Sequence, residues 1–387
     1  MMKWTTMLLT WLAGASLAVA QSYVPPPESA GGWRWCKNPA EVRKLGGMDP
    51  DKLQLIKEKQ LMLFQGPWQI VIIHHGYLVA EWYGVPTMPT TTFDGWSSTK
   101  SSTGIAFGLL LDDSRHHKLP HDTQVTLDTP IYDHVPEGFP LSDPGKKDIL
   151  LRHILSMSSG IPGEDHGLIG LSSAPGGGDF EIALGKQADR FGYWASHLTS
   201  KPGTAWEYSD AGFEHLSLFF YHVTGREIAE VMKERVFEPI GVENFSWDRQ
   251  GGVAGNIGPH TNPHSGLRFS ARDFARVGYL MAHGGKWGDK QIVPEWWVEE
   301  ATKSSQQINP SYGYTFWVNT TGALWPTAPR DAFAFRGFTA SRLYVIPSLD
   351  LVIARLGYAP QNWGEENLLP AVIAAVSDSP STSTAQK

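Results

Sequence analysis

The chain has 387 residues, of which 41% are hydrophobic and 18% charged, so it can bury one large core or two moderate ones. Its formal net charge is −7 at pH 7, and no basic run argues for a nucleic-acid partner. Cys36 is the only cysteine, which excludes an internal disulfide.

The N-terminus predicts an export signal. Lys3 precedes an apolar run over residues 4–19, and Ala18-Val19-Ala20 has the small-x-small pattern of a signal-peptidase site. We expect residues 1–20 to be a signal peptide that is removed, which predicts a secreted or periplasmic protein. An uncleaved anchor is the alternative, but the run is short for a membrane span. No later stretch has 18 consecutive apolar residues, so we expect no membrane span in the mature chain.

The first elements after the signal are a lead-in, a helix and a hairpin. Residues 21–40 are expected to be extended, and residues 53–63 to form a helix. Two β-rich runs, 68–74 and 77–83, flank His75-Gly76, so this segment predicts a β-hairpin with a tight turn.

The middle of the chain is mainly helical in prediction. Residues 98–111 are largely apolar, with Gly104 and Gly108 on one face, as in a buried central helix. A long Gly/Pro/Ser-bearing loop is expected over 163–178. Further helices are expected over 148–156, 210–223, 226–236, 270–283 and 294–303.

The last third returns to strands. They are expected over 312–318, 342–346 and 351–355, before a helix over 365–376 and a disordered tail over 378–387. Strands at both ends around a helical middle predict an α/β (α+β) fold, with an antiparallel sheet from both termini flanked by helices, and an inserted helical domain. One main domain is predicted over 41–377, with a sheet subdomain over 41–100 and 265–377 and a mainly helical subdomain over 101–264.

The most informative motif is Ser97-Ser98-Thr99-Lys100. Residues three apart lie on one face of a helix, so the Ser97 hydroxyl and the Lys100 amine are expected to be neighbours. A serine needs an adjacent base to become a nucleophile, and an unprotonated lysine can be that base. A Ser-x-x-Lys motif occurs about once by chance in a chain of this length, so it indicates a catalytic pair only if other motifs accompany it.

Two further motifs accompany it: Tyr208-Ser209-Asp210, and Arg336-Gly337-Phe338-Thr339 before a strand. With these, the chain resembles the serine β-lactamase and penicillin-binding-protein superfamily. It is most similar to the branch of class C β-lactamases, D-aminopeptidases, family VIII carboxylesterases and 6-aminohexanoate-dimer hydrolases. The matching segments run from about Gln69 to Tyr358.

The resemblance implies a β-lactamase/transpeptidase-like fold and a set of roles. Ser97 would be the acylated nucleophile, and Lys100 and Tyr208 would share the general-base and general-acid work. The oxyanion hole would use the N–H of Ser97 and one N–H from Gly337, Phe338 or Thr339.

Two departures from the family pattern leave alternatives open. Asp210 stands where the family has asparagine, so it either holds Lys100 protonated or caps a helix. The Lys-Thr-Gly strand motif is absent, and Arg336 either replaces its cation or is a solvated arginine at a strand end. The class A deacylating glutamate is also missing, which makes efficient penicillin hydrolysis a weaker expectation.

Other polar and aromatic residues receive more ordinary interpretations. His74-His75 and His116-His117 are adjacent pairs that point to different faces, and no His-Glu-x-x-His occurs, so we predict no metal and no other cofactor. His153 is interpreted as a structural hydrogen-bonding residue. Trp206, Trp317 and Trp325 are expected near the site, where they would form an aromatic wall.

The sequence therefore predicts an exported serine hydrolase that cleaves small carboxylic esters through an acyl-enzyme at Ser97. The alternatives are an amide or peptide hydrolase of the aminohexanoate-oligomer or D-amino-acid type, a β-lactamase or DD-peptidase, and a catalytically weak binding module of the same fold. An α/β-hydrolase is disfavoured because Ser97 lacks the Gly-x-Ser-x-Gly context. The expected partner is a small ester or amide, and the oligomeric state stays open.

Overall fold

A computed structural model describes residues 23–63, 66–169, 178–360, 363–365 and 368–377. The predicted signal peptide (1–20), the predicted tail (378–387) and part of the predicted loop over 163–178 lie outside these ranges. Within them, no helix is both long and apolar enough to cross a membrane.

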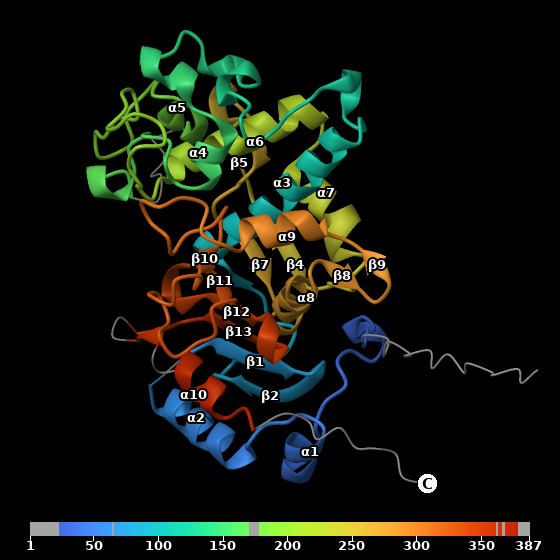
Figure 1. Cartoon of the computed structure of the whole chain (residues 1–387). Coiled ribbons are helices and arrows are strands. Elements are labelled where there is room, and N and C mark those ends of the chain that lie inside the picture. Colours follow the sequence, from blue (N-terminus) through green and yellow to red (C-terminus); the bar gives the residue numbers. More distant parts are fainter. Residues whose placement is uncertain (1–22, 64–65, 170–177, 361–362, 366–367, 378–387) are drawn as a thin grey trace, which may run out of the picture.

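A six-stranded antiparallel sheet combines strands from the two ends of the chain (Figure 1). The two ends of the chain meet where β1 (Trp68–His74) pairs with β13 (Leu351–Gly357), with Ile72 opposite Ile353. This confirms the predicted sheet. In spatial order the strands are β10 (Trp317–Val318), β11 (Phe333–Arg336), β12 (Arg342–Ile346), β13 (Leu351–Gly357), β1 (Trp68–His74) and β2 (Tyr77–Tyr83).

The predicted hairpin is confirmed at β1 and β2. His75 and Gly76 both have positive φ, 50° and 70°, as a two-residue type I′ turn requires. The β1 strand is buried along its whole length, because its two faces pack on different helices. Ile70 and Ile72 belong to a core with α2 (Pro50–Leu63) and α10 (Leu369–Ala374).

The opposite face of the sheet packs on α8 (Ala271–Ala282) and continues into the helical part of the molecule. Val71 and Ile73 belong to this larger core. At its centre lies α3 (Thr99–Arg115), which is almost wholly buried. A Cβ on Gly108 would lie 2.0 Å from the Trp297 ring, so the glycines on this face allow close packing. Figure 1 shows the helical part above the sheet, with α3 running toward the β10–β11 side.

The remaining elements complete the helical part and short ribbons. The helices are α1 (Pro39–Lys44), α4 (Leu151–Leu155), α5 (Asp179–Ala183), α6 (Asp210–Thr224), α7 (Ile228–Met232) and α9 (Glu295–Ala301). The short strands are β3 (Phe93–Asp94), β4 (Phe245–Trp247), β5 (Arg249–Gln250), β6 (His260–Thr261), β7 (Leu267–Phe269), β8 (Lys286–Trp287) and β9 (Lys290–Gln291).

Several predicted boundaries are wrong for local reasons. The predicted strand over 312–318 is reduced to Trp317–Val318, since Thr315 has a φ of 71° that interrupts extended backbone. The last helix begins at Leu369, because Pro370 lacks an N–H and is tolerated only in the first turn. The helix expected from residue 148 begins at Leu151, after an extended Ile149.

Two further differences concern whole segments. The helix predicted over 226–236 divides into α7 and a π-helical turn over Lys233–Phe237. Strand β11 was not predicted, although it pairs with β12 along all four of its residues and ends beside the site.

Candidate active site

The backbone presents Ser97 at a sharp turn between β3 and α3. Trp96 has a φ of 50°, and its N–H donates to Asp94 Oδ1 at 2.7 Å, which fixes the turn. Residues Trp96–Ser98 form a 3₁₀ turn that continues into α3. Ser97 is half-buried just before α3, a largely buried helix whose peptide dipoles favour a developing negative charge at its N-terminal end.

Lys100 lies one helical turn further on and is only 1% exposed. Its Nζ is 3.1 Å from Ser97 Oγ and 2.6 Å from Asp210 Oδ1. The ammonium also lies 4.7 Å from the centre of the Tyr208 ring. The predicted Ser97–Lys100 proximity is thus present, and Asp210 is the counter-ion of Lys100.

Asp210 does not cap α6, so that interpretation is wrong. Ser209 is the cap, since its Oγ accepts a 2.9 Å hydrogen bond from the Gly212 N–H. Asp210 is the first helical residue, and its carboxylate points at Lys100. Burial opposes ionisation of Asp210, but the charges of Lys100 and His264 lower its pKa below the usual value.

Tyr208 precedes this cap and hydrogen-bonds the Ser97 hydroxyl. Loss of contact with water and the charge of Asp210 raise the pKa of Tyr208 well above 10, although the bond to Ser97 opposes the shift. At neutral pH the phenol therefore keeps its proton. It can donate that proton to an oxygen placed next to Ser97.

Gly337 brings β11 against the turn that carries Ser97. A Cβ at this position would lie 2.1 Å from the Gly95 carbonyl oxygen, so only glycine permits this approach. The Gly337 N–H donates to the Ser341 carbonyl at 2.8 Å, which leaves the Phe338 N–H as the candidate second oxyanion donor beside that of Ser97. Thr339 lies outside the pocket lining, and its carbonyl accepts a 2.6 Å bond from Arg355.

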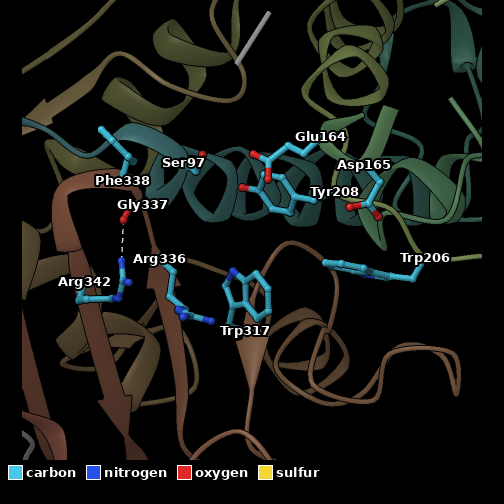
Figure 2. Close-up of a pocket in the computed structure, with 10 residues that line it drawn as sticks. All are labelled: Ser97, Glu164, Asp165, Trp206, Tyr208, Trp317, Arg336, Gly337, Phe338 and Arg342. Atoms are coloured by element: carbon cyan, nitrogen blue, oxygen red, sulfur yellow. Dashed lines mark hydrogen bonds between the residues drawn. The ribbon is translucent and has the colours of Figure 1, made fainter. Parts of the chain in front are cut away.

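An open pocket of about 360 Å³ gives access to Ser97. Figure 2 shows Ser97 and Tyr208 on one side of it, with Trp317 and Arg336 across from them. Tyr208 and Trp317 stack with ring centroids 6.4 Å apart, so much of the wall is aromatic. The lining residues are Ser97, Glu164, Asp165, Trp206, Tyr208, Trp317, Arg336, Gly337, Phe338 and Arg342.

Two of the three expected tryptophans line this pocket, whereas Trp325 does not. Trp325 belongs to the core on the far face of the sheet, packs edge-on against Tyr344 at 5.7 Å, and donates to Glu365 at 2.6 Å. Its expected place in an aromatic wall is therefore wrong. The loop that carries it folds back over β12 instead of toward Ser97.

Arg336 lines the pocket as a paired cation, so the solvated interpretation is wrong. Its Nε is 2.8 Å from Glu365 Oε1, and its guanidinium lies 4.5 Å from the Trp317 ring centre. Arg342 shares the same carboxylate oxygen at 2.7 Å. Two guanidinium groups thus share one carboxylate, which leaves positive charge on this side of the pocket.

Four acidic or basic residues near the site were not predicted. Glu164 and Asp165 lie exposed at the pocket rim. They belong to the loop predicted over 163–178, in which the sequence pattern singled out no individual residue. His264 and Glu214 lie behind Lys100, with His264 Nε2 2.8 Å from Glu214 Oε1. No local spacing links these last two residues to Ser97, because they meet only through tertiary packing.

The histidines singled out in the sequence lie elsewhere. His153 Nδ1 accepts from the Leu150 N–H at 3.1 Å, in keeping with a structural role. Across the described residues, no group of three or more His, Cys, Asp or Glu side chains is arranged to hold a metal ion.

A family model described as Beta-lactamase matches residues 65–376, most of the chain. The protein belongs to the β-lactamase family. The resemblance to the serine β-lactamase and penicillin-binding-protein superfamily that was inferred from its motifs is thereby confirmed.

Proteins similar in sequence to this chain have several activities in their names. An Escherichia coli K12 protein, provisionally named D-alanyl-D-alanine carboxypeptidase, is 22% identical over 92% of this chain and 91% of its own length. The unguisins hydrolase ungD of Aspergillus violaceofuscus is 25% identical over 48% of this chain. The matched region spans only 32% of that fungal protein.

Solved structures confirm the fold. A provisionally named 6-aminohexanoate-dimer hydrolase from Bacillus anthracis superposes with a TM-score of 0.61 and 20% identity, covering 88% of this chain and 85% of its own. EstCE1, a hydrolase with promiscuous acyltransferase activity, has a TM-score of 0.59 and 16% identity, covering 85% and 98%.

Proposed function

We propose that this protein is an exported esterase that hydrolyses small carboxylic esters through an acyl-enzyme at Ser97. The carrying observation is the 3.1 Å contact between Ser97 Oγ and Lys100 Nζ at the base of an open aromatic pocket. The predicted signal over residues 1–20 supports export.

The chemistry needs one proton to leave the resting site. Lys100 sits beside the Asp210 carboxylate as an ammonium, so it becomes a base only after giving up that proton. Ser97 Oγ then attacks the ester carbonyl carbon while its proton passes to the Lys100 amine. The carbonyl oxygen becomes an oxyanion that the N–H groups of Ser97 and Phe338 stabilise.

The tetrahedral intermediate collapses when the bond to the alcohol oxygen breaks. The Tyr208 phenol donates a proton to the departing alkoxide and recovers one from Lys100, which leaves an ester on Ser97. Water then attacks the acyl carbon with the same groups as base and acid, and releases the carboxylic acid. Because Trp206 and Trp317 line the pocket, an apolar acyl or aryl group would bury its surface there.

An amide substrate with charged ends is the second candidate. Glu164 and Asp165 lie at one wall of the pocket and Arg336 at the other, so a linear molecule with an ammonium and a carboxylate has complementary charges available. The structural likeness to a chain named as an aminohexanoate-dimer hydrolase is consistent with this candidate.

The test compares p-nitrophenyl butyrate hydrolysis by the wild type, Ser97→Ala and Ser102→Ala. Ser102 is a matched control, buried on the same helix outside the pocket. We expect Ser97→Ala to lose at least about 1000-fold in kcat/KM while Ser102→Ala retains activity. Equal rates in wild type and Ser97→Ala would overturn the proposal. A wild-type protein that does not hydrolyse p-nitrophenyl butyrate but cleaves an aminohexanoate dimer would favour the second candidate.

A further inference from the structure

Four charged groups lie together in the protein interior behind Ser97. Lys100 comes from α3, Asp210 and Glu214 from α6, and His264 from the segment between β6 and β7. Their side chains are 1%, 6%, 0% and 9% exposed, respectively. The proposed chemistry uses only Lys100 and Asp210, so His264 and Glu214 need a separate explanation.

His264 lies between the two carboxylates. Its Nε2 is 2.8 Å from Glu214 Oε1, and its Nδ1 is 3.7 Å from Asp210 Oδ2. Lys100 takes the other Asp210 oxygen at 2.6 Å and also donates to the His264 main-chain carbonyl at 3.4 Å. Asp210 is therefore shared between the Lys100 ammonium and the His264 imidazole.

Charge balance in this interior favours a protonated imidazole. A buried carboxylate needs a counter-ion, and Lys100 can serve only one of the two carboxylates. Burial alone would lower the pKa of His264, but Asp210 and Glu214 outweigh it and raise that pKa above 6.5. Burial also raises the pKa of Glu214, and His264 opposes that rise, so the two residues titrate as a pair.

Other groups face this cluster from neighbouring elements. They are Glu164 and Tyr208 near Asp210, Tyr312 near Lys100 and Asp210, Asp179 of α5 near Glu214, and Gln250 of β5, which donates a hydrogen bond to Glu214.

We propose that His264 is a positioning residue whose positive charge, held in place by Glu214, weakens the electrostatic attraction between Asp210 and the Lys100 ammonium. In this way His264 sets the pH at which Lys100 can accept the Ser97 proton. This proposal rests on the proposed function, in which Lys100 is the base. A carboxylate that serves two cations stabilises each of them less, so Lys100 releases its proton at lower pH than beside an unshared Asp210. His264 is absent from the pocket lining, so it acts through Asp210 and not on the substrate.

The experiment measures kcat/KM for p-nitrophenyl butyrate against pH in the wild type, His264→Gln and Asp210→Asn, and in the double variant. Loss of the imidazolium leaves Asp210 to Lys100 alone, so His264→Gln should move the acidic limb up by about one pH unit. Asp210→Asn should move the limb down. In the Asp210→Asn background, His264→Gln should produce little further movement, because the residue through which it acts is gone. His153→Gln, a histidine outside the pocket lining, should leave the profile unchanged.

An acidic limb that stays in place in a folded His264→Gln protein would overturn the inference. A shift of equal size in both backgrounds would also overturn it, since His264 would then act without Asp210. If His264→Gln does not fold, NMR of the wild-type imidazole decides: we expect a ring that is mostly protonated at pH 6.5, and a ring that is mostly neutral at that pH contradicts the proposal. Activity retained by Ser97→Ala would instead contradict the proposed function itself. Failure of the proposed function is therefore distinguishable from failure of the inference about His264.

Discussion

At the scale of single residues, the site is a balance of charges around one hydroxyl. Lys100 and Asp210 form a buried ion pair 2.6 Å apart, and Tyr208 holds its proton because burial and the nearby carboxylate disfavour a phenolate. A resting enzyme of this kind has an acid ready and a base that must first be deprotonated.

Tyr208→Phe tests the acid role. The substitution removes the phenolic oxygen that contacts Ser97 but keeps the ring that stacks on Trp317. We expect kcat/KM for an alkyl ester such as ethyl butyrate, whose alkoxide needs a proton to depart, to fall by about 100-fold or more, with little change in thermal stability. Tyr312→Phe is the matched control, because Tyr312 is a buried neighbour outside the pocket lining. Equal losses in the two variants would argue that the ring environment matters and the Tyr208 oxygen does not.

At the scale of elements, the site depends on how closely β11 approaches the turn before α3. Gly337 has ordinary extended dihedral angles, so its side-chain hydrogen is needed for space and not for backbone conformation. Phe338 follows Gly337 and lines the same pocket as Ser97, so we expect its N–H to serve as an oxyanion donor only while this contact persists.

Gly337→Ala should therefore impair catalysis more than stability. A methyl group 2.1 Å from the Gly95 oxygen must push the end of β11 away, and a displacement of about 1 Å can cost about 100-fold in rate. We expect a loss of that size in kcat, measured with a p-nitrophenyl ester, in a protein that keeps its circular dichroism spectrum. Wild-type kcat in Gly337→Ala would show that the β11 end does not hold the oxyanion donor.

The same elements show what sequence patterns could and could not predict. Spacing on one helix predicts the Ser97–Lys100 pair, and turn residues predict the β1–β2 hairpin, because both depend on local geometry. Strand β11 was missed since four residues carry too little period-two signal. His264 lies 164 positions from Lys100, so their contact exists only in the folded core. For Asp210 the sequence left two roles open, a counter-ion of Lys100 or a helix cap. The structure shows the contact with Lys100, whereas Ser209 is the cap.

At the scale of the whole molecule, two cores on the two faces of one sheet support the fold, and the larger core contains ionisable side chains. His215 is fully buried on α6 and contacts Tyr132 of this core. Its Nδ1–H donates to the Ala211 carbonyl at 3.0 Å, and its Nε2 accepts from the Tyr132 hydroxyl at 2.8 Å, so the neutral ring is satisfied. Burial lowers its pKa from 6.5 to about 3.

This arrangement predicts acid sensitivity. Below pH 6.5 the unfolded chain binds a proton at His215 that the folded protein refuses until about pH 3, so stability falls as the pH falls through this window. Between pH 6.5 and about pH 4, His215 alone should lower the free energy of unfolding by about 3 kcal/mol. Urea denaturation across this range should show a shallower pH dependence for His215→Gln, while His116→Gln, at an exposed site, should match the wild type. Parallel slopes for all three would contradict the assignment.

The most direct test of the central claim is intact-protein mass spectrometry after brief mixing with p-nitrophenyl butyrate, followed by acid quenching and peptide mapping. We predict a mass increase of one butyryl group on the peptide that contains Ser97, absent from Ser97→Ala and present in Ser102→Ala. A butyryl group on another residue, or ester turnover with no trapped acyl-enzyme at any quenching time and undiminished rate in Ser97→Ala, would contradict nucleophilic catalysis by Ser97.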